Sequence, residues 1–382
     1  MGDVLMDKPH LVIVRTSGSV LDLTTYNCQE LGLAQSLTSK GFKVSLILAG
    51  KDSKYIQIGN VSVYYCKLVA LNQQIAYFRN ISSLLKQLKP NLIQIHEIGL
   101  FMSWFVARWA RRNHVPSVLI QGNYRTTQKP IKKQFEQSFN AIFGKSVLKS
   151  VSAIGYKTQR ANQYVQSYIN KKSFPTYVGL DESKFVGGSN YDWQKELKLD
   201  GKKVLLYVGS LEKRRNPSLL IETLSKLSSD VVLVLVGRGP LQNESVELAQ
   251  KLGVANRCIF LGALKQTELP SLYHCADLFL LASDYEIYGM VILEAMFFGV
   301  PVVSTLTAGS ESIISHGKDG MIINSLDANQ WGEQIENLLQ HPDCLNSMRT
   351  AASKKIHEEL LWNKAVDGFI NLYKYADTSL NI

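Results

Sequence analysis

The chain has 382 residues, which is more than one hydrophobic core usually serves, so we expect two domains. Its composition, 46% hydrophobic and 19% charged residues, is typical of a globular protein, and no run of about 18 apolar residues predicts a membrane span. The apolar run near the N-terminus is too short, and its flank too acidic, for a signal peptide. Five scattered cysteines without a CxxC pair argue against a disulfide framework or a zinc site and indicate the cytoplasm.

The positive charge of the chain is concentrated in its first half. Residues 1–180 contain 23 Lys and Arg against 7 Asp and Glu, whereas residues 181–382 contain 19 against 25. A basic half of this kind predicts an anionic partner: a nucleic acid, an anionic membrane surface or a phosphorylated substrate. No known nucleic-acid-binding motif accompanies the charge, so we expect no nucleic acid and favour the other two.

Short apolar runs alternate with helical patterns along both halves, which predicts parallel, doubly wound α/β sheets. The strands expected in the first half are Leu11–Val14, Val44–Leu48, Val61–Tyr65, Leu92–Ile95, Val118–Ile120 and Ala153–Tyr156. The strands expected in the second half are Val204–Val208, Val231–Val236, Cys258–Leu261, Leu278–Leu281 and Val300–Ser304. A Gly-rich, charged stretch at 181–202 predicts a linker. We therefore expect domains at 1–183 and 184–360, with the helix of 361–382 packing back on the first.

The stretch LLASDYEIYGMVILEAMFFGVPVVST at 280–305 is the most informative for chemistry. Glu294 lies among large apolar residues, where a buried carboxylate is costly without a polar partner. A helix beginning near Tyr288–Gly289 would direct free N–H groups at a phosphate, and Gly289 would let a ligand approach the backbone closely. Glu294 would then lie about 7.5 Å along the axis, near a nucleotide ribose, and Glu286 would lie near a sugar. The alternative is that Glu294 faces solvent and Glu286 is a loop charge.

Residues 286–294 resemble the E-x7-E element of family 4 retaining glycosyltransferases of the bacterial surface-polysaccharide type. The flanking sequence segments also follow the order and spacing of that family: YVGSLEKRRNPSLLIETL (207–224), VGRGPL (236–241), FLGALKQTELPSLYHCADLFLLAS (260–283) and GVPVVSTLTAGSESIISHGKDGMII (299–323). The resemblance is dense from 204 to about 340 and thinner before it. It implies the GT-B fold, in which two Rossmann-like domains face each other across a cleft. The first would bind the acceptor and the second the nucleotide-sugar donor.

The resemblance also implies roles for individual residues. Arg215 takes the place of the family's diphosphate-binding Lys, and Arg can clamp phosphate oxygens bidentately. Ser210 stands where the family often has Arg, so one cationic contact to the diphosphate is either missing or supplied elsewhere, with Arg214 as the candidate. The expected catalytic residues are Glu286, which orients sugar hydroxyls, Arg215 and His96. The residues expected to bind the donor are Gly18, Ser19, Ser210, Arg214, Arg215, Gly237, Leu264, Glu286, Ile287, Tyr288, Gly289, Met290 and Glu294.

The first half departs from the family pattern in two places. NLIQIHEIG (91–99) resembles the family's D-x-x-H-x-H segment and retains His96, but Gln94 replaces the earlier histidine. Gln121 replaces the histidine of a His-Gly pair near the reacting sugar, and a glutamine can hydrogen-bond a sugar hydroxyl but cannot titrate. For His96 the alternative is a strand-end histidine satisfied by the backbone.

The implied reaction is sugar transfer with retention of anomeric configuration, without a bound metal and without a cofactor beyond the nucleotide sugar. We favour a UDP-sugar from family frequency. Negative charge builds on the leaving diphosphate, where Arg215, Arg214 and the N–H groups near Gly289 would stabilise it.

Two segments of the basic half mix cations with aromatic residues, LFMSWFVARWARR (100–112) and TTQKPIKKQFEQSFNAIFGKSVLKS (126–150). Such mixtures suit the interface of an anionic membrane. We therefore expect peripheral binding to the inner face of the cell membrane and a lipid-linked, phosphate-bearing glycan acceptor. The alternative is that the aromatic residues pack inside and the lysines form a solvated face.

The substitutions Ser210, Gln94 and Gln121 keep a second hypothesis open, a catalytically silent glycosyltransferase-like subunit that supports a partner enzyme. A GT-B epimerase or a synthase with a soluble acceptor also fits the motifs. The sequence indicates neither the sugar, the linkage nor the oligomeric state.

Overall fold

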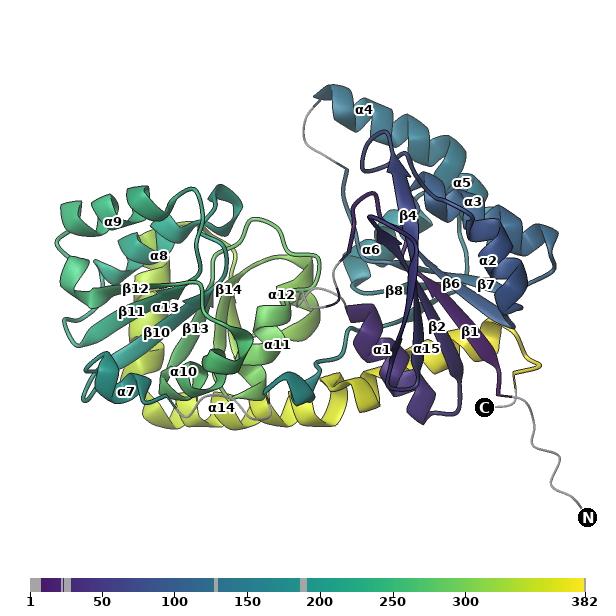
Figure 1. Ribbon diagram of the computed structural model, residues 1–382. Helices are drawn as coiled ribbons and strands as arrows, with labels where there is room; N and C mark the ends of the chain where they lie inside the picture. The colour runs from purple at the N-terminus through teal and green to yellow at the C-terminus, as the bar shows by residue number, and fades with distance from the viewer. Residues whose placement is uncertain (1–7, 22, 24–28, 127–129, 186–190, 381–382) are drawn as a thin grey trace, which may run out of the picture. The chain divides into compact units, whose positions relative to one another are not determined.

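The computed structural model describes residues 8–21, 23, 29–126, 130–185 and 191–380, and the chain forms two compact α/β units (Figure 1). The first unit comprises residues 1–179 and 362–382, and the second comprises 180–361. The first boundary thus lies four residues before the expected 183/184 division. The C-terminal helix α15 (Trp362–Ala376) belongs to the first unit.

The first unit is built on a nine-stranded sheet in the order β3-β4-β2-β1-β6-β7-β8-β9, with β5 paired to β4. Its strands are β1 (His10–Val14), β2 (Lys43–Gly50), β3 (Lys54–Ile58), β4 (Val61–Ala70), β5 (Ala76–Phe78), β6 (Leu92–His96), β7 (Ser117–Gln121), β8 (Ala153–Tyr156) and β9 (Ser173–Pro175). All neighbours pair in parallel except β3 and β5, which run antiparallel to β4. The expectation of a purely parallel sheet was wrong for this edge.

Helices cover both faces of the first sheet. One face packs its Val, Ile and Leu side chains against α2 (Ile81–Leu88), α3 (Phe101–Arg112) and α5 (Lys145–Ser150). The other face is covered by α1 (Gln29–Ser39) and α15, which contact each other. The remaining helices of this unit are α4 (Pro130–Phe139), the π-helical turn η1 (Asn140–Gly144) and α6 (Gln159–Gln166).

The second unit contains a fully parallel sheet in the order β12-β11-β10-β13-β14-β15. Its strands are β10 (Lys203–Val208), β11 (Val231–Val236), β12 (Cys258–Gly262), β13 (Leu278–Leu281), β14 (Val302–Thr305) and β15 (Gly320–Ile323). Its helices are α7 (Trp193–Glu196), α8 (Pro217–Leu224), α9 (Gln242–Lys251), α10 (Leu269–Cys275), α11 (Met290–Phe297), α12 (Ala308–Ile313), α13 (Ala328–Gln340) and α14 (Pro342–Lys355). Leu278 and Leu280 pack into the core that α8 and α13 share, whereas Phe279 points to the opposite face and contacts Tyr273 of α10. This alternation explains why β13 reads as a continuous apolar run.

Short helical turns complete the chain. They are η2 (Glu182–Phe185), η3 (Lys213–Arg215), η4 (Ala255–Arg257), η5 (Gln266–Glu268) and the π-helical turn η6 (Ile356–Leu360). Within the described residues, no helix is long and apolar enough to cross a membrane. The described cysteines Cys66, Cys258, Cys275 and Cys344 are free thiols, and Cys28 lies outside the described residues.

Candidate functional site

The candidate donor site lies where the strand order of the second unit reverses. Strand β10 is flanked by β11 on one side and by β13 on the other, so the connections that leave β10 and β13 run in opposite directions along the sheet. Ligands of doubly wound sheets bind outside the carboxyl ends of the strands at such a switch point. The segment with Arg214 and Arg215 follows β10, and the segment with Glu286 follows β13.

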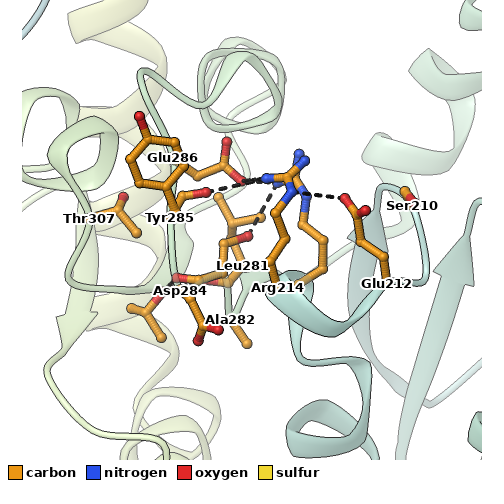
Figure 2. Close-up of polar contacts among 12 residues, drawn as sticks. Ser210, Glu212, Arg214, Leu281, Ala282, Asp284, Tyr285, Glu286 and Thr307 are labelled. Atoms are coloured by element: carbon orange, nitrogen blue, oxygen red, sulfur yellow. Dashed lines mark hydrogen bonds and ion pairs between the residues drawn. The ribbon is translucent and has the colours of Figure 1, made fainter. Parts of the chain in front are cut away.

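Arg214 and Arg215 both contact the Glu286 carboxylate, and Figure 2 shows Glu286 beside Arg214. Arg215 donates from Nη1 to Glu286 Oε1 and to Ser283 Oγ, the latter over 3.2 Å. Arg214 Nη1 lies 3.5 Å from the same carboxylate oxygen, and its Nε lies 2.9 Å from Glu212 Oε1. Glu286 is only 8% exposed. The Nε of Arg215 is buried and has no hydrogen-bond partner within the described part of the chain, so the guanidinium retains a donor for an anion.

Asn216 holds the two site segments together. It adopts a left-handed backbone conformation (φ 48°), and its side-chain Nδ2 donates to the Ala282 carbonyl (2.8 Å) and to Asp284 Oδ1 (2.6 Å). The Asp284 amide in turn donates to the Arg214 carbonyl over 2.8 Å. Asparagine adopts this conformation more readily than most residues. The sequence analysis did not single out Asn216, although an Asn directly before Pro217 is a turn signal.

The helix predicted beside Gly289 is present. Helix α11 begins at Met290, and Gly289 caps it with a left-handed backbone (φ 85°) that favours glycine. Tyr288 is buried and its neighbour Ile287 is 36% exposed. A Cβ on Gly309 of α12 would lie 2.1 Å from the Tyr288 carbonyl oxygen, so α12 packs directly against the approach to the helix.

Glu294 does not face solvent. It is 2% exposed, and Tyr273 of α10 donates its hydroxyl to Glu294 Oε2 over 3.1 Å. Burial, reinforced by the Glu294 charge, raises the pKa of Tyr273 well above its ordinary value, so the hydroxyl remains a donor. The solvent-facing alternative for Glu294 was wrong, and the sequence analysis missed Tyr273 as its partner.

The remaining expected donor residues of this unit lie at the carboxyl ends of β10, β11 and β12. Ser210 is exposed, and its carbonyl accepts the Tyr207 hydroxyl over 2.8 Å. Gly237 has φ 134°, and a Cβ there would lie 1.8 Å from the Gly209 carbonyl oxygen, so only glycine fits. Leu264 is half-buried between β12 and η5.

The other expected site residues belong to the first unit. Gly18 and Ser19 follow β1, and a Cβ on Gly18 would meet the Gln73 carbonyl oxygen at 2.1 Å. Their predicted position facing the donor diphosphate stays a prediction. His96 ends β6, which neighbours β1, so it too stands at a switch point of its sheet.

His96 is enclosed in a polar network. Its Nε2 lies 3.0 Å from the Gln94 amide nitrogen, and its Nδ1 lies 3.7 Å from Glu30 Oε1. The Tyr373 hydroxyl donates to Gln94 Oε1 over 2.5 Å, which directs the Gln94 amide nitrogen to donate to the ring. Burial lowers the pKa of His96 to about 3, although the Glu30 carboxylate opposes this effect. The ring is therefore neutral near pH 7, and its predicted catalytic role stays a prediction.

The side-chain amide of Gln121, which could have met a sugar hydroxyl, is bonded inside the protein. It is 1% exposed, and its Nε2 donates to Glu97 Oε2 and to the Asn123 carbonyl, each over 2.7 Å, while its Oε1 accepts from the Ile98 amide. Glu97 adopts a left-handed backbone (φ 61°) and also accepts from the Asn123 amide at 3.2 Å. Both N–H groups of Gln121 are thus used inside the protein. Glu97, which the sequence analysis missed, holds the segment that follows β7.

The chain is similar in sequence to known proteins. Residues 190–355 match the model of the family described as Glycosyl transferases group 1. A Methanocaldococcus jannaschii protein, described as an uncharacterized glycosyltransferase, is 25% identical over 370 residues, which cover 90% of this chain and 93% of that protein. The D-inositol 3-phosphate glycosyltransferase of Rhodococcus jostii is 25% identical over 248 residues, which cover 62% of this chain and 55% of that protein.

The fold recurs in solved structures. Anabaena Alr3699/HepE in complex with UDP and glucose superposes with a TM-score of 0.71 at 17% identity, and the match covers 96% of this chain and 99% of that one. At this level of identity the likeness establishes the fold, and the family match supplies the enzyme class. The chain has the GT-B fold, and residues 190–355 of its second unit are similar to the family described as Glycosyl transferases group 1, which supports a transferase enzyme.

Proposed function

We propose that the second unit binds a nucleotide-diphosphate sugar, with UDP as the favoured nucleotide, and that the chain transfers the sugar with retention of anomeric configuration. The observation that carries the proposal is the convergence of Arg214 and Arg215 on Glu286 at the switch point of the sheet. The ligands of the Anabaena structure, UDP and glucose, support the choice of nucleotide.

Each end of the donor has a residue suited to it. The diphosphate would take the guanidinium groups of Arg215 and Arg214 together with the N–H groups of the first turn of α11, which are charge-assisted or dipole-assisted donors. The Glu294 carboxylate, held by Tyr273, would accept from the ribose hydroxyls. Glu286 accepts a hydrogen bond from Arg215, so diphosphate binding to Arg215 would exchange one anionic partner for another and leave Glu286 to orient sugar hydroxyls.

The transfer step depends on the same cations. Breaking the bond between the anomeric carbon and the diphosphate puts oxocarbenium character on the sugar and negative charge on the leaving phosphate oxygen. Arg214 and Arg215 would stabilise that charge in a site whose geometry is fixed beforehand by Asn216. The proposed scheme includes no metal ion bound by the protein.

We further propose that the acceptor is a glycan linked to a lipid phosphate and that the chain acts at the inner face of the cell membrane. The net excess of Lys and Arg in residues 1–180 supports an anionic acceptor. The Rhodococcus jostii relative is named a D-inositol 3-phosphate glycosyltransferase, and a phosphorylated acceptor also suits the basic first unit here.

Nucleotide binding tests the proposal directly. Scanning fluorimetry and calorimetry with UDP, GDP and ADP should show stabilisation by UDP, about 2.7 kcal/mol at about 100 times its dissociation constant. Arg215→Ala should abolish the effect, whereas Lys213→Ala, which removes an exposed neighbouring cation, should not. Equal binding by Arg215→Ala and the unmodified chain would exclude this site. Binding of UDP-sugars without transfer to any acceptor and without slow hydrolysis would favour the silent-subunit alternative.

A further inference from the structure

A continuous helical segment of the first unit, the 130–150 helix, consists of α4, η1 and α5. The residues at its two junctions, Phe139 and Lys145, keep right-handed helical backbone angles, so the π-helical turn does not break the segment. Figure 1 shows α4 and α5 running one after the other along the side of the first unit that also carries α3.

The inner side of the 130–150 helix is anchored in the unit. Val147 and Leu148 are fully buried and belong to the core of the first unit, and Phe139 is 6% exposed. The Phe143 ring stacks on Phe139 at 4.5 Å and meets Trp104 of α3 edge-on at 5.3 Å.

The aromatic residues of the other segment expected at a membrane, residues 100–112, also pack against their own unit. Trp104, Phe105 and Trp109 lie against the core of the first unit, and Phe105 meets Tyr77 edge-on at 5.1 Å. These three side chains are only partly buried, and the expectation that this segment contacts a membrane stays a prediction.

The outer side of the 130–150 helix carries large apolar side chains that are exposed in the described part of the chain. Ile131 is 86% exposed, Phe135 46% and Ile142 68%. Ile131 and Phe135 are four residues apart and therefore share one face of α4. Exposed single apolar residues are ordinary, but three of this size along one helix mark an interaction surface.

The charge of this surface indicates its partner. Lys132, Lys133, Lys145 and Lys149 are all exposed, and Glu136 is the one acidic residue of the 130–150 sequence. A second copy of the chain would bring like charges together, which opposes self-association through this face. Lysines beside protruding apolar side chains suit a bilayer surface, where the apolar groups enter between headgroups and the ammonium groups meet lipid phosphates.

We propose that the outer side of the 130–150 helix is the face that docks on an anionic lipid bilayer. The inference deepens the proposed function, because it rests on a membrane-linked acceptor, and it assigns the contact to Ile131, Phe135, Ile142 and the four lysines. Burial of the apolar side chains provides the attraction that salt does not screen, and the lysines provide the attraction to anionic lipid that salt does screen.

Vesicle sedimentation of the full chain tests the proposal, with phosphatidylcholine vesicles that contain or lack phosphatidylglycerol. The unmodified chain should bind only the anionic vesicles. Each lysine changed to serine should weaken binding by roughly fivefold at low salt, and the triple change Ile131→Ser, Phe135→Ser, Ile142→Ser by at least roughly tenfold. Because these side chains are exposed, far-UV circular dichroism and UDP affinity should not change.

Two matched controls lie in the second unit. Leu326→Ser removes a 55% exposed apolar side chain, and Lys251→Glu reverses an exposed lysine, and neither should change vesicle binding. Absence of binding to anionic vesicles at low salt, or an equal loss in controls and test variants, overturns the proposal. Self-association that the triple change abolishes, without lipid binding, assigns the face to a second copy and also overturns it. UDP affinity, measured on the same samples, reports separately on the proposed function.

Discussion

The buried His96 makes the free energy of unfolding depend on pH, and the sign and size of this dependence can be predicted. Burial lowers its pKa from 6.5 to about 3, so between these values the unfolded chain binds a proton at this position that the folded chain does not. The stabilisation contributed by the neutral ring is therefore complete above pH 6.5 and falls as the pH drops toward 3, by about 1.4 kcal/mol per pH unit. Acidification from pH 6.5 to about 4.5 should cost roughly 2 kcal/mol through this group alone.

The perturbation is His96→Gln, which places an amide near the position of Nε2 and cannot titrate. Urea unfolding followed by circular dichroism should show a smaller loss of stability on acidification for this variant than for the unmodified chain, by about 2 kcal/mol. The variant His341→Gln, which removes an exposed histidine of the second unit, provides the control. NMR titration of the histidine ring protons gives a direct check. A His96 pKa near 7, where a general base works best, or parallel acid profiles for all three proteins, would refute the reasoning.

Three further predictions concern the donor site. Glu286→Gln should slow transfer by about 100-fold without weakening UDP binding in calorimetry, because it releases the arginines; equal losses of both would contradict the assigned role. Tyr273→Phe should weaken UDP binding by about tenfold, since the buried Glu294 loses a hydrogen bond to a charged group worth about 1.5–3 kcal/mol; unchanged affinity would show that the hydroxyl does not position the carboxylate. Gly237→Ala should lower the melting temperature far more than Gly253→Ala, because a Cβ at Gly237 meets a backbone carbonyl oxygen at 1.8 Å, whereas Gly253 also has positive φ but no atom within 4 Å; equal shifts would mean that the loop rearranges freely.

The fold was largely predictable because buried parallel strands read as short apolar runs. Strands β8, β11 and β13 have the predicted bounds. Strand β3 was not predicted, because its sequence KYIQI lacks an apolar run and is mostly exposed at the sheet edge. Its hairpin did leave a signal, since Gly59-Asn60 joins β3 to β4 and Gly59 adopts φ 53°. An antiparallel edge on a parallel sheet is therefore best sought in turn residues.

The two units differ in how much of the site their sequence revealed. In the second unit Arg215 and Glu286 follow neighbouring strands, so the strand pattern alone brings them to one edge. In the first unit the pKa of His96 depends on Glu30, which packs against it from a segment far away in the chain. The hydrogen bonds of Gln121 depend on Glu97, which adopts a left-handed backbone conformation. Motif spacing carries no information on whether such a side chain is already satisfied inside the protein.

The return of α15 to the first unit has a consequence for synthesis. Residues 180–361 are contiguous, so the ribosome releases everything the second unit needs before the chain is finished. The first unit begins earlier but must wait for the last helix, whose Tyr373 hydroxyl reaches the buried Gln94. A truncation at the C-terminus would therefore damage the unit that was translated first, while a fragment of residues 180–361 would retain every segment of its own core.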